Sequence, residues 1–141
     1  MEKYSKRGKA DRSWGFEIVW ASNELYSAKI MVFPKAGNKT ALMIHKNRKK
    51  SWFVNGGKFK ITFTDVLTGE QKEQVLEEGK TVDIADMSPH MLEALTDNSM
   101  IFEVGTADEL EDQFKLSPDV DQKQTSMQEL DPQSFHHRDK A

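Results

Sequence analysis

GNKTALMIHKNRKKSWFVNGG, residues 37–57, begins at a glycine, runs through an apolar stretch to His45, crosses a charged turn and closes on two glycines. A second segment, GKTVDIADMSPH at residues 79–90, also begins at a glycine, passes through a turn and ends at His90. One histidine at a strand end is most often a polar surface group. Two histidines at corresponding places in two such segments favour a shared pocket.

Short β-rich runs, broken by Gly, Pro, Asn and Asp, flank these segments in both directions. Strands are predicted at residues 14–20, 26–33, 41–45, 51–55, 58–65, 73–76, 81–84, 90–94 and 100–104. Turns are predicted at 34–37, 55–57, 67–70 and 77–79, where glycine accepts positive φ angles. Many short strands of this kind predict an all-β barrel or two packed sheets. Only residues 108–114 look helical, with Thr106 as the expected N-cap.

The composition divides the chain into three parts. Residues 1–12 are basic and polar, so they are expected to form a flexible arm. Residues 13–116 carry the β pattern and form the predicted domain, since 141 residues suffice for one domain. Residues 117–141 are rich in Asp and Gln and poor in large apolar side chains, and are expected to be a disordered tail.

Charge and composition also limit the partners. No apolar stretch is long enough to span a membrane and the N-terminus lacks a signal-peptide core, so a cytoplasmic location is expected. The chain has no cysteine, which excludes disulfides and thiolate metal sites. A net charge of −3 and the lack of an aromatic platform beside the basic run 46–50 argue against nucleic acid. That run is expected to be a solvated turn.

The two histidine segments resemble the two sequence motifs of the cupin family. The first cupin motif is Gly, five residues, His-x-His, three or four residues, Glu, six residues and Gly. Placed on this chain without gaps, it starts at Gly37, ends at Gly57, and puts its two histidines and its glutamate at Met43, His45 and Lys50. The second motif starts at Gly79 and places its histidine at His90, with residues 85–87 in place of Pro-x-Gly.

The resemblance extends over about residues 13–116. The opening at residues 14–17, the strand at 26–29 and the close at 102–106 are similar to small cupins related to mannose-6-phosphate isomerase. This resemblance implies an all-β, double-stranded β-helix, the jelly-roll barrel of cupins, with a short C-terminal helical turn. It also implies a pocket at the barrel mouth, because the motif histidines line such a pocket in the family.

The metal site that the resemblance implies is incomplete in this sequence. Cupins hold Mn, Fe, Ni or Zn with three imidazoles and a carboxylate, whereas only His45 and His90 match here. An ammonium at Lys50, about 4 Å from a dication, would cost roughly 8 kcal/mol at an effective dielectric of about 20. A complete site contributes about 10 kcal/mol or more. The expected cofactor is therefore none or a weakly bound divalent metal, with Asn47 as an alternative oxygen ligand.

An anion is the alternative occupant of this pocket. Lys50 beside His45 and His90 would bind a sugar phosphate or carboxylate, and these three residues are also the candidate catalytic groups. The sequence leaves open whether Lys50 points inward or into solvent. The remaining candidate ligand-binding residues are Lys29, which shares a strand face with Met31 and Phe33, Met43, Trp52, Glu17 and Glu103. Trp52 would pack in the core or stack on a sugar, and the two glutamates would be acid–base groups or structural ion pairs.

Two functions follow from these alternatives. The first is a cupin-fold protein that binds an anionic carbohydrate or sugar phosphate with a reduced or absent metal site. The second is a metal-dependent sugar-phosphate isomerase or epimerase that resembles mannose-6-phosphate isomerase. A homodimer that pairs through an edge strand at residues 14–20 is a further expectation.

Overall fold

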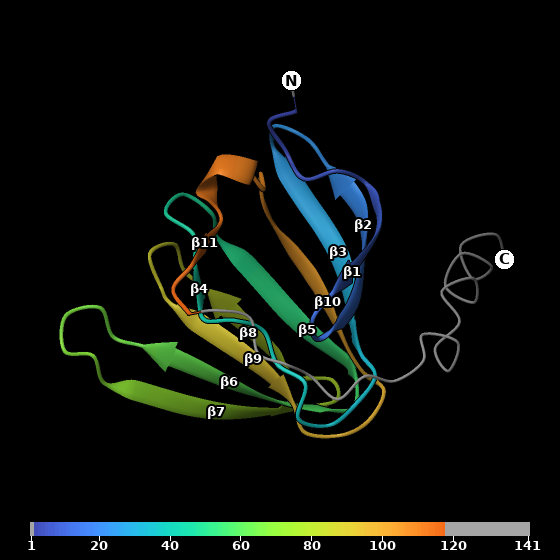
Figure 1. The fold of residues 1–141 in the computed structure, drawn as a ribbon, viewed down its shortest axis with the longest axis vertical. Helices are drawn as coiled ribbons and strands as arrows, with labels where there is room; N and C mark the ends of the chain where they lie inside the picture. Colours follow the sequence, from blue (N-terminus) through green and yellow to red (C-terminus); the bar gives the residue numbers. More distant parts are fainter. Residues whose placement is uncertain (1, 118–141) are drawn as a thin grey trace, which may run out of the picture.

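The computed structural model describes residues 2–117, which form two antiparallel sheets that face each other (Figure 1). The six-stranded sheet consists, in spatial order, of β1 (Gly8–Arg12), β2 (Gly15–Ser22), β3 (Tyr26–Phe33), β10 (Ser99–Thr106), β5 (Lys50–Gly56) and β8 (Thr81–Ile84). The five-stranded sheet consists of β11 (Phe114–Lys115), β4 (Met43–Ile44), β9 (His90–Ala94), β6 (Lys58–Thr64) and β7 (Gln71–Glu77). The predicted all-β architecture is confirmed.

An apolar core fills part of the space between the sheets. Alternate residues of each strand point inward, so β5 contributes Trp52 and Val54 while β6 contributes Phe59 and Ile61 from the opposite sheet. Trp14 stacks on Phe33 with ring centroids 4.3 Å apart. The core ends at Trp14, Met31 and Trp52, which also line the polar cavity described below.

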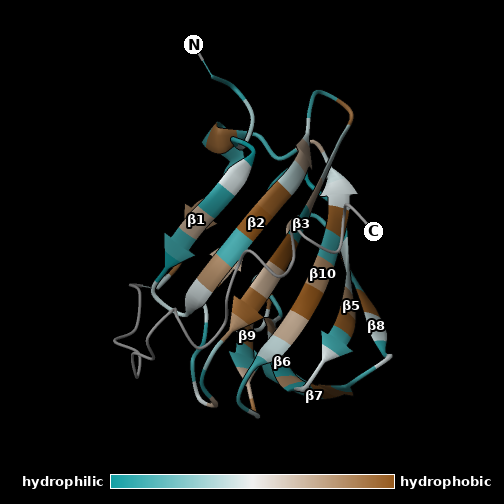
Figure 2. Ribbon diagram, turned by 90° about the vertical axis from the view of Figure 1, so that its right-hand side faces the viewer, coloured by the Kyte–Doolittle hydropathy of each residue, from teal (hydrophilic) through white to brown (hydrophobic). Residues whose placement is uncertain are grey.

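The structure places residues 8–12 in a strand, β1, within the segment 1–12 that was expected to be a flexible arm. β1 pairs with β2 along its whole length, from Gly8 opposite Val19 to Arg12 opposite Gly15. β1 is mostly hydrophilic, whereas β2 and β3 carry hydrophobic bands (Figure 2). An edge strand is held by backbone hydrogen bonds on one side and needs no apolar face, and for this reason the composition did not reveal it.

β1 also changes which strand lies at the sheet edge. The expected edge at residues 14–20 lies in β2, which is hydrogen-bonded to β1 on one side and to β3 on the other. The prediction that this strand pairs two subunits is therefore wrong. The edges of the six-stranded sheet are β1 and β8 and those of the five-stranded sheet are β11 and β7, so a dimer formed by edge pairing would use one of these four strands.

The helical turn near the C-terminal end is shorter than predicted. A 3₁₀ helix spans Leu110–Asp112, and Glu109 precedes it without a capping side-chain hydrogen bond. Thr106 is not its N-cap, because Thr106 is the last residue of β10 and its hydroxyl accepts a hydrogen bond from the Lys49 backbone N–H. The expected tail is outside the described residues except for Ser117. Within residues 2–117 no helix is long and apolar enough to cross a membrane, and the cytoplasmic location stays a prediction.

Candidate functional site

A cavity of about 450 Å³ lies between the two sheets, beside the apolar core. Its volume is in the range of small-molecule sites. The structure brings the eight residues that were named as catalytic or ligand-binding candidates to this one cavity: Glu17, Lys29, Met43, His45, Lys50, Trp52, His90 and Glu103 all line it. These side chains come from both sheets, so the cavity exists only because the sheets pack face to face.

The two histidines approach each other because β4 pairs with β9. Met43 lies opposite His90 in that pairing, and His45 follows one residue after the strand ends. The ring centroids of His45 and His90 are 6.3 Å apart. The Nδ1 atom of His45 lies 2.8 Å from the carbonyl oxygen of Asp112, and that of His90 lies 2.8 Å from the carbonyl oxygen of Ser88.

These two hydrogen bonds determine the tautomer of each ring. A carbonyl oxygen only accepts, so Nδ1 carries the hydrogen and each neutral ring keeps a lone pair on Nε2. Burial, followed by the charge of Lys50, lowers the pKa of His45 to about 4. The same two causes lower the pKa of His90 well below its ordinary value. Both imidazoles are therefore neutral at pH 7 and offer hydrogen-bond acceptors.

Lys50 points into the cavity, which answers the question that the sequence left open. Its side chain is only 8% exposed, and Nζ lies 3.5 Å from Oε1 of Glu103. Nζ also lies 5.0 Å from the ring centroid of Trp52, a cation–π arrangement. Burial lowers the pKa of Lys50 to about 8, although Glu103 opposes that shift. At pH 7 the ammonium form therefore predominates.

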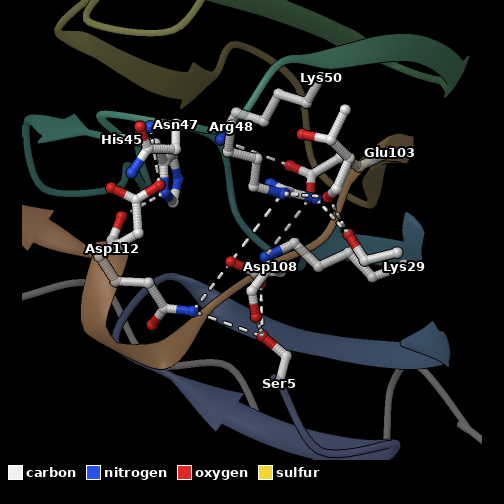
Figure 3. Close-up of polar contacts among 12 residues, drawn as sticks. Ser5, Lys29, His45, Asn47, Arg48, Lys50, Glu103, Asp108 and Asp112 are labelled. Carbon is white, nitrogen blue, oxygen red and sulfur yellow. Dashed lines mark hydrogen bonds and ion pairs between the residues drawn. The ribbon is translucent and has the colours of Figure 1, made fainter. Parts of the chain in front are cut away.

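Glu103 is the centre of a buried network of charges (Figure 3). The indole N–H of Trp52 donates to Oε1 over 2.7 Å, and the guanidinium of Arg48 donates to Oε2 over 3.0 Å. Nζ of Lys29 lies 3.9 Å from Oε2. Burial raises the pKa of Glu103, but Lys29, Lys50 and Arg48 together outweigh it and hold the pKa well below its usual range. The carboxylate is thus ionised at neutral pH.

Lys29 is shared between two carboxylates. Its Nζ donates to Oε2 of Glu17 over 3.1 Å and also lies near Glu103. Burial lowers the pKa of Lys29, but the charges of Glu103 and Glu17 outweigh it and raise the pKa above its ordinary value. Arg12 from β1 donates to the other oxygen of Glu17 over 2.8 Å. The structure therefore places both predicted glutamates in ion pairs.

Arg48 is the important residue that the sequence reasoning missed. Its side chain is 2% exposed, whereas the run 46–50 was expected to be a solvated turn. The guanidinium donates to the Thr106 carbonyl oxygen over 3.1 Å and to Oγ of Ser27 over 2.6 Å, besides Glu103. The expectation of a solvated turn holds for Lys46 and Lys49, whose side chains are exposed.

A signal for Arg48 was present in the sequence. Arg48, Lys50, Trp52 and Val54 are alternate residues, and all four are buried. Extending the period-two pattern of the Trp52 strand back by four residues would have predicted that Arg48 faces the same interior.

Residues of the N-terminal segment and of the segment after β10 line part of the cavity. Ser5 hydrogen-bonds to the carboxylate of Asp108, and its backbone N–H donates to the Asp108 carbonyl oxygen. Nε of Arg48 lies 3.9 Å from Oδ1 of Asp108. Burial raises the pKa of Asp108, but Arg48 and the Ser5 hydrogen bond outweigh it and lower the pKa. The ordered start of the chain is thus connected to the charged network (Figure 3).

The donor set in the cavity does not fit a tightly bound divalent metal. Residues 2–117 contain no group of three or more His, Asp or Glu that could hold one. His45 and His90 each offer one Nε2, whereas the other motif positions offer the thioether of Met43 and the ammonium of Lys50. Asn47 is exposed and does not line the cavity, so it is not the alternative oxygen ligand.

Restoring the motif ligands should create a metal site. We expect the double variant Met43→His, Lys50→Glu to bind Ni²⁺ at least about tenfold more tightly than the wild type, because it supplies three imidazoles and a carboxylate. Isothermal titration calorimetry measures the affinity. The control is Met43→His with Lys49→Glu, which makes the same charge change at an exposed position. Equal affinity in the two double variants would mean that positions 43 and 50 do not face one site.

Three solved structures similar to this one identify the fold. CapF, a capsular polysaccharide assembling protein from Staphylococcus aureus, superposes with a TM-score of 0.67 at 19% identity, covering 78% of this chain and 34% of CapF. KdgF from Halomonas sp. superposes with a TM-score of 0.61 at 15% identity, covering 79% of this chain and 97% of KdgF. The cupin domain of Schizosaccharomyces pombe Cnp3 superposes with a TM-score of 0.57 at 12% identity, covering 66% of this chain and 64% of the Cnp3 domain.

The chain therefore has a cupin fold, as its two histidine segments predicted. It spans about a third of the length of CapF. No family model and no curated protein matches the sequence. Identities below 20% to these structures establish the fold alone, so the function has to be argued from the cavity itself.

Proposed function

We propose that this protein binds a small hydroxylated organic anion, an acidic sugar or a sugar phosphate, in the cavity and without a tightly bound metal. The observation that supports it best is the ammonium of Lys50 in the same cavity as the neutral imidazoles of His45 and His90. The ammonium attracts a carboxylate or phosphate oxygen. The two Nε2 lone pairs accept hydrogen bonds from hydroxyl groups.

Among Lys29, Arg48 and Lys50, the cavity cations that lie near Glu103, Lys50 is the one best placed to receive an anion. Arg48 lies 3.0 Å from a carboxylate oxygen of Glu103, and Lys29 lies 3.1 Å from one of Glu17. The closest carboxylate distance of Lys50 is longer, at 3.5 Å. A ligand anion can therefore approach Lys50 without breaking a short ion pair.

Trp52 supports this mode of binding rather than stacking on a neutral sugar. Its side chain is buried, with 1% exposed, and it packs against His90 at 5.5 Å between ring centroids. It is therefore a wall of the cavity and not a platform at its rim. CapF is a capsular polysaccharide assembling protein, which agrees with a carbohydrate-derived ligand, but at 19% identity it does not carry the proposal.

The isomerase alternative has less support. Abstraction of a proton next to a carbonyl requires a base with a pKa near neutral. The pKa of His45 is lowered to about 4 and that of His90 well below its ordinary value, so both are weak bases. The donor set also does not fit the metal that the family's isomerases use.

Calorimetry with a small panel of sugars tests the proposal. We expect gluconate, glucuronate or glucose 6-phosphate to bind, and uncharged glucose, the matched control, not to bind. The pKa of Lys50 is about 8 and only its protonated form attracts the anion. Affinity should therefore be nearly constant up to pH 7 and be about tenfold weaker at pH 9. Equal binding of glucose, or no loss of affinity above pH 8, would contradict an anion site at Lys50.

A further inference from the structure

We propose that Lys50 is a reactive amine, which forms an imine with the aldehyde or ketone group of a small ligand in the cavity. This adds a covalent activity to the binding function proposed above. It rests on that function in one respect, because the cavity must admit a small hydroxylated or anionic carbonyl compound.

The position of Lys50 is fixed by its backbone and by its neighbours. Lys50 is the first residue of β5 and is paired with Gly105 of β10 on one side and Ile84 of β8 on the other. A side chain at position 105 would place its Cβ 2.9 Å from that of Lys50 and 2.7 Å from the Lys49 carbonyl oxygen, so only glycine fits. The backbone of β10 therefore packs directly against Lys50, whose side chain is 8% exposed and lines the cavity.

Within residues 2–117, three cations lie within 4 Å of Glu103, and Lys50 is the one that can release its proton. The guanidinium of Arg48 does not lose a proton in proteins. Lys29 lies between Glu17 and Glu103, which favour its charged form. Lys50 has a single carboxylate neighbour at 3.5 Å, and the same Oε1 atom already accepts the indole N–H of Trp52. Its lowered pKa agrees with this geometry.

The groups that act electrostatically on Lys50 come from several elements. Glu103 and Asp108 favour its charged form, and Arg48 and Lys29 oppose it. The charge of Lys50 in turn lowers the pKa of His45 and His90. Both imidazoles are neutral, and the lone pair on each Nε2 can accept a hydrogen bond from a hydroxyl group of the ligand.

The chemical step is balanced without a cofactor. The ammonium first loses a proton to solvent water, and the Nζ lone pair then forms a bond to the carbonyl carbon while the π electron pair moves to the oxygen. That oxygen then receives one proton from Nζ and one from solvent and leaves as water, with formation of the carbon–nitrogen double bond. One amine and one carbonyl compound give one imine and one water, and nothing is oxidised or reduced.

Reductive trapping with glyoxylate, a small anionic aldehyde, tests the proposal on the full chain. Sodium cyanoborohydride is added at pH 7, and peptide mass mapping measures the adduct at each lysine. An amine with a pKa of about 8 has a neutral fraction about 300-fold above that of an ordinary lysine, partly offset by lower intrinsic nucleophilicity. We expect the Lys50 adduct to exceed those at exposed Lys46 and Lys49 by at least about tenfold.

Two variants complete the experiment. Lys50→Arg keeps the charge but cannot form an imine, so the selective adduct should disappear, whereas Lys49→Arg should leave it unchanged. The map of the wild-type protein is decisive even if Lys50→Arg does not fold. Adducts spread over the exposed lysines, with none enriched at Lys50, would overturn the proposal.

Binding of gluconate, which has no aldehyde or ketone group, separates this inference from the proposed function. Calorimetric binding of gluconate without selective labelling of Lys50 means that only the imine proposal is wrong. Selective labelling without gluconate binding means that the amine is reactive but the anion site is wrong. Labelling that gluconate reduces supports both, and the absence of both signals overturns both.

Discussion

Replacement of Glu103 by alanine is expected to lower the free energy of unfolding by about 3–5 kcal/mol. The carboxylate is 1% exposed, and it is the counter-charge nearest to Arg48 and Lys50. Its removal leaves these cations buried without compensation, and also leaves the indole N–H of Trp52 without its acceptor. Both costs act in the folded state only, since water solvates the same groups in the unfolded chain.

Urea denaturation followed by tryptophan fluorescence measures this loss. The control is Glu73→Ala, because Glu73 forms an ion pair of 3.1 Å with Lys60 but is 59% exposed, and such pairs contribute about 0–1 kcal/mol. Glu103→Gln keeps the shape of the side chain and an acceptor for the indole N–H. Its loss in the free energy of unfolding should therefore lie between those of Glu103→Ala and Glu73→Ala. A loss at Glu103 no larger than at Glu73 would mean that the buried network does not hold the sheet together.

Replacement of Lys50 by methionine is expected to weaken binding of the sugar anion about 10- to 100-fold while stabilising the fold. The loss of affinity follows from the loss of a charge-assisted hydrogen bond, worth about 1.5–3 kcal/mol. The gain in stability follows from the pKa of Lys50, because lowering it from 10.5 to about 8 means that the folded state opposes the charge. At pH 7 this removes a penalty of about 1–3 kcal/mol.

Lys29→Met is the matched control for stability. Lys29 is a partly buried lysine of the same cavity, but its pKa is raised, so the folded state favours its charge. Its replacement should destabilise the protein where the replacement of Lys50 stabilises it. Thermal unfolding of both variants at pH 7 shows whether each substitution raises or lowers the stability, and calorimetry measures ligand binding. Equal destabilisation by the two variants would mean that Lys50 is a structural counter-ion and not a ligand-binding group.

Most strands could be predicted because their signals are local. β3, β8 and β9 have the predicted limits, since each combines alternation of apolar residues with a turn at its end. β1 could not be predicted in this way, because its residues are largely exposed and its order comes from pairing with β2. β11 has only two residues, too few for any pattern.

The members of the cavity could also be predicted, but their pairing could not. The motif positions of His45, His90, Met43 and Lys50 and the strand face of Lys29 pointed to one interior. The ion pair between Arg48 and Glu103 depends instead on how β5 and β10 align, with Trp52 opposite Glu103. Nothing local to position 48 indicates that alignment, and the partner of Arg48 is therefore found only in the folded chain.

The sequence by itself determined the succession of most strands and turns, the alternation of faces along those strands and the incomplete metal ligand set, because these depend on residues close together along the chain. Only the tertiary structure decided that Arg48 forms an ion pair with Glu103 and that Lys29 forms one with Glu17. It also decided that Lys50 lies farther from its nearest carboxylate than either of these two cations does. Electrostatic energy depends on distance in space and on burial. The charge state of Lys50 is therefore a property of the packed sheets and not of the motif in which it lies.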